Sequence, residues 1–106
     1  ELKKINAKEF KKLYSVRFNQ ILLIDVRDNE EFKKSYIDGS ISIPLNTLEK
    51  ESNIEFIKKE SLMKEVFTLC QIGKRSEIAS KILIKLKIPS QSIEGGIEKI
   101  NQIELS

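Results

Sequence analysis

The sequence predicts an α/β fold: a mainly parallel sheet with helices on both faces. Short apolar, β-rich runs alternate along the chain with longer segments of helical periodicity, a pattern typical of parallel sheets whose connections are helices. The composition is globular, with 40% hydrophobic and 33% charged residues, so the chain can bury a core. A length of 106 residues suits one compact domain, and we expect residues 1–106 to form a single domain.

Four strands and three helices are predicted from local patterns. The apolar, β-rich runs at residues 21–24, 41–43, 66–69 and 92–93 are predicted as strands. A Ser, Asn or Asp followed three positions later by Glu resembles a capping box, in which each side chain binds the other residue's backbone N–H. This pattern predicts helices that begin after Asn6, Asp28 and Ser52, the first of them over residues 7–14.

The fourth and longest predicted helix begins near Arg75. It carries an apolar stripe at helical spacing, which we expect to face the sheet: Ile78, Ala79, Ile82, Leu83 and Leu86. A proline disfavours the helical conformation at the residue before it. We therefore expect the helix to stop at Ile88 and Pro89.

The only cysteine of the chain, Cys70, lies where the strand 66–69 meets this helix. The first turn of a helix leaves backbone N–H groups unpaired and presents the positive end of the helix dipole. These groups, together with Lys74 and Arg75, would stabilise a thiolate. Because binding sites of open parallel sheets lie at the carboxyl ends of strands, we predict that Cys70 is an accessible nucleophile.

A lone cysteine after a strand is more often a buried, inert small hydrophobe. The next six residues favour the functional interpretation: Gln71, Ile72, Gly73, Lys74, Arg75 and Ser76. Gly73 permits a positive φ, so successive N–H groups can converge on one anion. Ser76 can cap the helix with its hydroxyl, and Arg75 supplies a permanent charge. We expect these six residues to bind the substrate around the sulfur.

Charge and cysteine content argue against several classes of function. The net charge of +3 arises from 19 basic and 16 acidic residues spread along the chain, without the basic block and interleaved aromatics of a nucleic-acid site. One cysteine and no histidine leave no internal disulfide and no recognisable zinc, haem or iron–sulfur ligand set. We expect no metal, no cofactor, no membrane span and a reducing compartment, the cytoplasm.

Four motifs, in order along the chain, resemble the rhodanese-like sulfurtransferase family. They are Leu-Ile-Asp-Val-Arg at 23–27 with Glu-Phe at 31–32, Ile-Asp-Gly-Ser-Ile-Ser-Ile-Pro at 37–44, the loop 70–76, and Gly-Gly-Ile at 95–97. The resemblance implies the rhodanese-like fold with a five-stranded parallel sheet. It also implies a catalytic Cys70 that carries sulfur as a persulfide, surrounded by the amides of its loop.

The sequence departs from the family pattern in three segments. Ser35 and Tyr36 stand where many relatives have Gly-His, and Ile100 stands where many have tryptophan. Gln71 and Ile72 replace the basic residues of some thiosulfate-using relatives. We interpret the first two as changes in packing or at the rim of the pocket, and the third as an argument against small anionic donors.

Five residues outside the loop are predicted to support it. An Asp at a strand end, such as Asp25, usually binds loop amides, and Arg27 lies close enough in sequence to pair with Glu31. We therefore expect structural roles for these three residues. Gly95 and Gly96 are expected to let the backbone approach closely beside the loop.

The resemblance implies a sulfurtransferase that passes sulfane sulfur from thiosulfate or a protein persulfide to a thiophilic acceptor through Cys70. Two alternatives stay open. Related dual-specificity phosphatases also have a cysteine loop ending in arginine, but the phosphatase resemblance requires five residues where this chain has four between Cys70 and Arg75. A non-catalytic binding module is the other alternative, although inactive relatives usually lack the cysteine.

The two ends of the chain resemble the carboxy-terminal rhodanese-like domain of adenylating enzymes of the molybdopterin and thiamine biosynthesis type. The resemblance implies a small sulfur donor or a persulfide-bearing protein as a partner. A ubiquitin-like sulfur carrier and an adenylating domain are the further partners that it implies. We expect neither nucleic acid nor a membrane among the partners.

Overall fold

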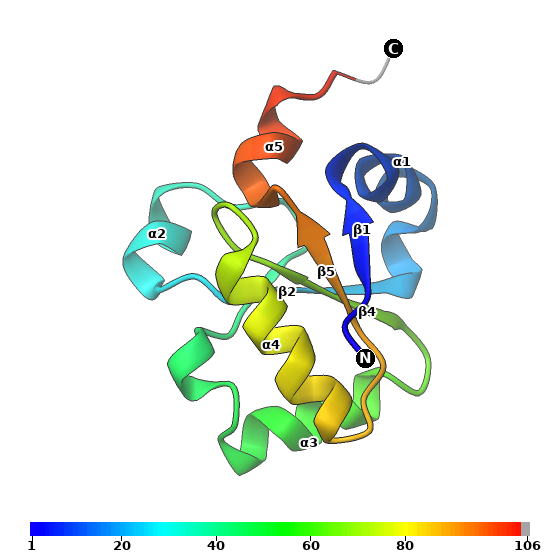
Figure 1. Ribbon diagram of the computed structural model, residues 1–106, viewed down its shortest axis with the longest axis vertical. Helices are drawn as coiled ribbons and strands as arrows, with labels where there is room; N and C mark the ends of the chain where they lie inside the picture. The colour runs from blue at the N-terminus through cyan, green and yellow to red at the C-terminus, as the bar shows by residue number, and fades with distance from the viewer. Residues whose placement is uncertain (105–106) are drawn as a thin grey trace.

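The computed structural model describes residues 1–104, in which five strands alternate with five α-helices (Figure 1). The strands are β1 (Lys4–Asn6), β2 (Ile21–Asp25), β3 (Ile41–Ser42), β4 (Glu65–Leu69) and β5 (Gln91–Glu94). The helices are α1 (Ala7–Arg17), α2 (Asn29–Lys34), α3 (Glu51–Glu60), α4 (Lys74–Lys85) and α5 (Gly96–Gln102). Short 3₁₀ turns at Phe18–Gln20 and Leu45–Thr47 complete the path.

The sheet has the strand order β1-β5-β4-β2-β3, and all of its neighbouring strands in the described part of the chain are parallel. The predicted α/β class is confirmed, and the sheet is parallel throughout. The sequence pattern missed β1, because this three-residue edge strand has only one half-buried residue and forms no apolar run. Asp25 lies opposite Leu69 in the register of β2 and β4, so the chain leaves both strands at the same edge.

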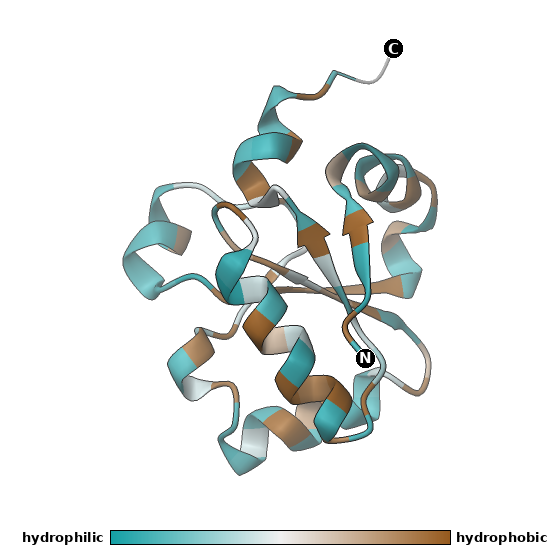
Figure 2. Cartoon of the chain, in the orientation of Figure 1, coloured by the Kyte–Doolittle hydropathy of each residue, from teal (hydrophilic) through white to brown (hydrophobic). Residues whose placement is uncertain are grey.

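The sheet is covered on both faces. Helices α3 and α4 pack on one face, and α1 and α5 pack on the other (Figure 1). Because side chains alternate along a strand, Leu22 and Ile24 of β2 join the first core cluster, whereas Ile21 and Leu23 join the second. Burial on both sides explains why the central strands are apolar runs (Figure 2).

The first two predicted helix starts are confirmed. The side chain of Asn6 caps α1 by accepting a hydrogen bond from the N–H of Glu9 at 2.8 Å. Asp28 and Glu31 form a complete capping box at the start of α2. Helix α1 runs to Arg17, three residues beyond the predicted end.

The third predicted start is wrong. Helix α3 begins at Glu51 with Lys50 at its N-cap position, and Ser52 lies inside the first turn. The backbone N–H groups of Asn53 and Ile54 both donate to the carbonyl of Lys50. The first turn therefore closes without a side-chain cap.

Helix α4 begins at Lys74, and the predicted apolar stripe is only partly confirmed: Ala79 and Leu83 are buried in the core cluster and Ile82 packs against it. Its buried residues are Ser76, Ala79, Ser80 and Leu83. Ile78 is 49% exposed, Leu86 lies at the C-cap, and the helix ends before Ile88 and Pro89. The stripe missed two inward positions because they are serines, which are tolerated there because their hydroxyls are hydrogen-bonded.

The α-helices of residues 1–104 are short, and the longest of them, α4, has 12 residues. None of the helices in this range is both long and apolar enough to cross a membrane. The same range contains no cluster of three or more His, Cys, Asp or Glu side chains that could hold a metal ion.

Candidate active site

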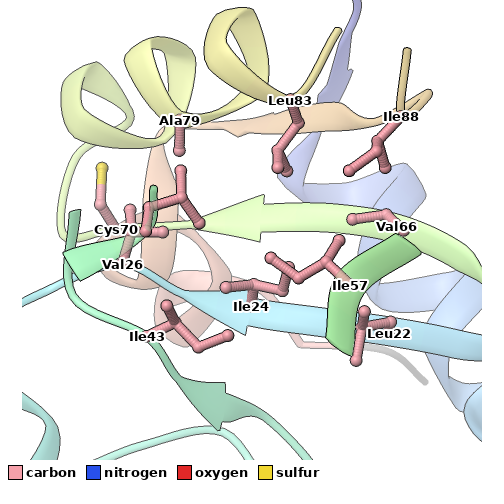
Figure 3. Close-up of a cluster of buried hydrophobic side chains, with 11 residues drawn as sticks. Leu22, Ile24, Val26, Ile43, Ile57, Val66, Cys70, Ala79, Leu83 and Ile88 are labelled. Carbon is pink, nitrogen blue, oxygen red and sulfur yellow. The ribbon is translucent and has the colours of Figure 1, made fainter. Parts of the chain in front are cut away.

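Cys70 follows β4 directly and turns its sulfur toward the first turn of α4 (Figure 3). Side chains at alternate positions 66, 68 and 70 face α4, because the neighbouring positions 67 and 69 belong to the opposite core cluster. The Cys70 residue is only 1% exposed. The prediction of an accessible sulfur is therefore wrong for this conformation, because the loop covers the sulfur that it surrounds.

Two backbone N–H groups are directed at the Cys70 sulfur. The N–H of Gly73 donates to Sγ at 3.1 Å, and the N–H of Ser76 donates to it at 3.2 Å. Gly73 reaches this position with φ of 111° as the N-cap of α4, a conformation that favours glycine. A Cβ at Gly73 would also lie 3.3 Å from the backbone nitrogen of Gly95. The loop therefore forms a two-donor site that stabilises negative charge on sulfur.

Arg75 does not donate a hydrogen bond to the sulfur. Its guanidinium donates to both carboxylate oxygens of Glu31, at 2.6 and 2.9 Å. This pair raises the pKa of Arg75 above its ordinary value, and the charge of nearby Cys70 contributes a smaller effect in the same direction. The hydrogen bonds from Arg75 lower the pKa of Glu31 to about 2. Arg75 is thus a half-buried cation whose charge is largely compensated.

The Glu31–Arg75 pair predicts a specific pH dependence of stability. Because folding lowers the pKa of Glu31 from 4.5 to about 2, the pair stabilises the fold fully above pH 4.5, and this contribution is lost as the pH falls toward 2. Both side chains are about one-third exposed, so we expect a contribution of about 1 kcal/mol. Denaturation of the wild type and Glu31→Gln should differ by this amount at neutral pH and converge near pH 2. A difference independent of pH would contradict the assignment.

Arg27 pairs with Asp25, so the predicted Arg27–Glu31 pair is wrong. The guanidinium of Arg27 binds both carboxylate oxygens of Asp25, the nearest contact being 2.8 Å. As expected for a strand-end aspartate, Asp25 also accepts the backbone N–H of Arg27 at 3.0 Å. Arg27 pairs with Asp25 because Asp25 is the last residue of β2 and Arg27 follows it by two residues, whereas Glu31 lies in the first turn of α2 and binds Arg75.

The guanidinium of Arg27 also joins two segments that border the site. It donates to the backbone carbonyl of Ser35 at 2.7 Å and to the side-chain oxygen of Gln71 at 3.4 Å. Tyr36 therefore lies close to the loop, where it stacks on Phe32 with ring centroids 4.7 Å apart. Arg27 acts as a buried brace between the Cys70 loop and the segment after α2.

The remaining loop residues lie at the surface. Ile72 is 54% exposed and Lys74 is exposed. Within residues 1–104, Lys74 forms no ion pair. A hollow of about 190 Å³ opens beside Arg75 and is lined by Val26, Asp28, Pro44, Leu45, Asn46 and Arg75. The outer surface of the site therefore combines an exposed aliphatic side chain with an exposed cation.

Ser76 does not cap α4, contrary to the prediction. It lies three residues inside the helix from the Gly73 N-cap. Its hydroxyl donates to the carbonyl of Gly73 at 3.0 Å and contacts the hydroxyl of Ser92 at 2.7 Å. No motif in the sequence indicated a role for Ser92, because a single serine in a short strand has no distinguishing pattern.

Gly96 allows the start of α5 to lie against the backbone of the loop. A Cβ at this position would overlap the carbonyl oxygens of Cys70 and Gln71. Those same oxygens accept hydrogen bonds from the N–H groups of Ile97 and Glu98, at 2.9 and 3.1 Å. The close approach predicted for the glycine pair is thus present, and Gly96 contacts the Cys70 backbone directly.

Together these features define a class: a parallel α/β protein with a cysteine loop at the carboxyl edge of its sheet, in which two backbone N–H groups donate to the sulfur. The model of the rhodanese-like domain matches residues 6–103. The chain belongs to the rhodanese-like domain family. The resemblance noted from the four motifs is confirmed, and sulfur transfer is the activity that the names of several relatives give.

Two relatives and one solved structure illustrate the match. The chain is 33% identical over 96 residues to the "Probable molybdopterin-synthase adenylyltransferase" of Pyropia yezoensis, with 91% of this chain and 25% of the relative covered. It is 32% identical over 89 residues to the adenylyltransferase and sulfurtransferase UBA4 of Meyerozyma guilliermondii, covering 80% of this chain and 21% of the relative. A rhodanese-related protein from Thermoplasma volcanium superposes with a TM-score of 0.77 at 26% identity, covering 94% and 91% of the two chains.

The chain spans only about a quarter of the length of the first of these relatives. The match therefore says nothing about the function of the rest of that relative.

Proposed function

We propose that this domain is a catalytic sulfurtransferase in which Cys70 carries sulfane sulfur as a persulfide. The observation that carries the proposal is the pair of N–H groups, from Gly73 and Ser76, that donate to Sγ at 3.1 and 3.2 Å. These donors stabilise a thiolate before the reaction and when it is regenerated, as an oxyanion hole stabilises an oxygen anion. A buried, structural cysteine would not require them.

The first step forms the persulfide. The Cys70 thiolate attacks the outer sulfur of the donor, a new S–S bond forms at Sγ, and the S–S bond of the donor breaks. The leaving group, sulfite from thiosulfate or a thiolate from a persulfide, departs with the electron pair of that bond. The sequence has no histidine to act as a base, so in this proposal the N–H groups of Gly73 and Ser76 stabilise the thiolate form that attacks.

The second step returns Cys70 to its starting state. A thiolate acceptor attacks the outer sulfur of the persulfide, and the bond between that sulfur and Sγ breaks with both electrons returning to Cys70. Because Cys70 is 1% exposed, the atoms that cover Sγ must move aside when a donor or acceptor binds. The same cover protects the thiolate from solvent between the two steps.

The charges around the loop favour a protein-bound persulfide over thiosulfate as the donor. The two guanidinium groups beside the loop are already paired, Arg27 with Asp25 and Arg75 with Glu31. Gln71 adds no charge, so a dianion such as thiosulfate would meet paired guanidinium groups close to the sulfur, and Lys74, the loop cation that forms no ion pair within the described residues, lies exposed at the outer surface. The exposed aliphatic side chain of Ile72 suits contact with a protein surface.

The names of the relatives support the proposed partners. Relatives named adenylyltransferase contain a segment similar to this chain, and a further relative is named as a sulfur carrier protein. We propose that this domain exchanges sulfur with a ubiquitin-like sulfur carrier and works with an adenylating domain. The expected cytoplasmic, reducing location remains a prediction.

Intact-mass measurement tests the proposal directly. The wild type, incubated with a protein or small-molecule persulfide and then desalted, should gain about 32 Da, the mass of one sulfur atom bound at the nucleophile. A reducing thiol should remove it. Cys70→Ser should gain nothing, and thiosulfate should load the wild type more slowly than a persulfide donor.

Two other results would favour the alternatives. A wild type that stays unmodified with every donor would point to a binding module. Hydrolysis of an aryl phosphate that depends on Cys70 would point to a phosphatase.

A further inference from the structure

Five hydroxyl groups are buried between α4 and the sheet, behind the Cys70 loop. They belong to Thr68 on β4, Ser76 and Ser80 on α4, and Ser90 and Ser92 at β5. Thr68 and Ser92 lie opposite each other in the register of β4 and β5. Buried hydroxyls are costly unless they are hydrogen-bonded. The hydroxyls therefore need an explanation beyond packing.

The first chain of hydrogen bonds runs from Ser92 to Gly73. The hydroxyl of Ser76 donates to the carbonyl of Gly73 at 3.0 Å, because a carbonyl can only accept. A serine hydroxyl has one proton to donate. Ser92 must therefore donate in the 2.7 Å contact between the hydroxyls of Ser92 and Ser76.

The second chain runs from Ser90 to the carbonyl of Ser76. Thr68 donates its proton to that carbonyl at 2.8 Å. By the same argument, Ser80 donates to Thr68 at 2.9 Å, and Ser90 donates to Ser80 at 3.1 Å. Each hydroxyl in the two chains thus has a defined direction.

Both chains end on the same two residues that hold the sulfur. The carbonyls of Gly73 and Ser76 accept the final hydrogen bonds, and the N–H groups of Gly73 and Ser76 donate to Sγ. We propose that Ser92 and Thr68 are positioning residues, which hold these two residues in the orientation that aims their N–H groups at Cys70. The inference rests on the proposed function only in taking the Cys70 thiolate as the reactive species.

The position of Gly73 shows why such positioning is needed. Gly73 has no side chain to anchor it, and its φ of 111° lies outside the helix that follows. The hydroxyl of Ser76, held in turn by Ser92, is a side-chain anchor for the carbonyl of Gly73. Without the proton from Ser92, the hydroxyl of Ser76 loses the partner that fixes its orientation.

The test is the rate of alkylation of the chain's only cysteine by iodoacetamide, measured by intact mass as a function of pH. In Ser92→Ala and in Thr68→Val, we expect the midpoint of this profile to rise by about half a unit to one unit, because misaligned donors stabilise the thiolate less. Ser92→Thr keeps the hydroxyl and should restore the wild-type midpoint. If Ser92→Ala does not fold, Thr68→Val tests the same proposal through the second chain.

Ser90→Ala is the matched control. It removes an equally buried hydroxyl at the far end of the second chain, and it leaves the bonds from Ser80 to Thr68 and from Thr68 to Ser76 in place. Its midpoint should stay at the wild-type value even if its stability falls. If a substitution only loosened the loop, the limiting rate of alkylation at high pH would rise, but the midpoint of the pH profile would not move.

The proposal is overturned if Ser92→Ala and Thr68→Val keep the wild-type midpoint, or if Ser90→Ala moves it equally. The alkylation profile does not require sulfur transfer. A wild type that fails to load sulfur while the midpoints still shift would refute the proposed function and leave the positioning role intact. If the wild type loads sulfur but Ser92→Ala and Thr68→Val keep the wild-type midpoint, the positioning role is refuted and the proposed function stands.

Discussion

Replacing Gly96 by alanine is expected to lower the free energy of unfolding by about 2–5 kcal/mol and to prevent sulfur loading. Gly96 has φ of 63°, and a left-handed conformation costs a residue with a Cβ about 1–2 kcal/mol. The added Cβ would also overlap the carbonyls of Cys70 and Gln71, and overpacking of this kind costs about 1–3 kcal/mol. To relieve the overlap, the backbone of the loop must move, and the N–H groups aimed at Sγ move with it. Chemical denaturation and the mass gain with a persulfide donor measure the two effects.

Gly95→Ala is the matched control for this prediction. Gly95 also has a positive φ, 83°, but a Cβ there would meet the side chain of Lys99 and not the Cys70 loop. Gly95→Ala should therefore lose stability and still load sulfur in its folded fraction. Gly96→Ala protein that loads sulfur as fast as the wild type would show that the loop tolerates the displacement.

The fold could be predicted from the sequence where burial imposes a pattern on consecutive residues. Strand β2 is buried on both faces, so its apolar run is unbroken and visible. Strand β1 lies at an edge and has no such run. The inward face of α4 was predicted only in part, because Ser76 and Ser80 are buried with hydrogen-bonded hydroxyls while Ile78 is half-exposed. Hydrophobicity alone cannot reveal a buried serine, since its burial depends on a partner elsewhere in the chain.

The candidate site could be predicted only in its local part. Cys70, the turn at Gly73 and the start of the following helix lie within seven consecutive residues. Their arrangement is therefore set by local sequence. The ion pairs were harder to predict from the sequence, because each of the two arginines near the site could pair with more than one carboxylate. Ser92 and Thr68 could not be found at all, because their contacts with Ser76 join separate strands to the helix.

Arg27→Met is expected to lower the free energy of unfolding by about 3–5 kcal/mol, the cost of leaving a buried carboxylate without its cation. Asp25 is 0% exposed and Arg27 is 3% exposed. After the substitution, Asp25 keeps the backbone N–H of residue 27 as a donor but loses the guanidinium. The variant also loses the hydrogen bonds to Ser35 and Gln71, which brace the two sides of the site.

Two further variants separate the buried charge from the loss of a long side chain. Arg17→Met removes the equivalent side chain from the ion pair with Glu65, in which both partners are 44% exposed, and it should change the free energy of unfolding by less than about 1 kcal/mol. The double variant Asp25→Asn, Arg27→Met should be less destabilised than the sum of the single variants, because it leaves no charge unpaired in the core. Strict additivity, measured by urea denaturation of all four proteins of the cycle, would show that Asp25 and Arg27 act independently.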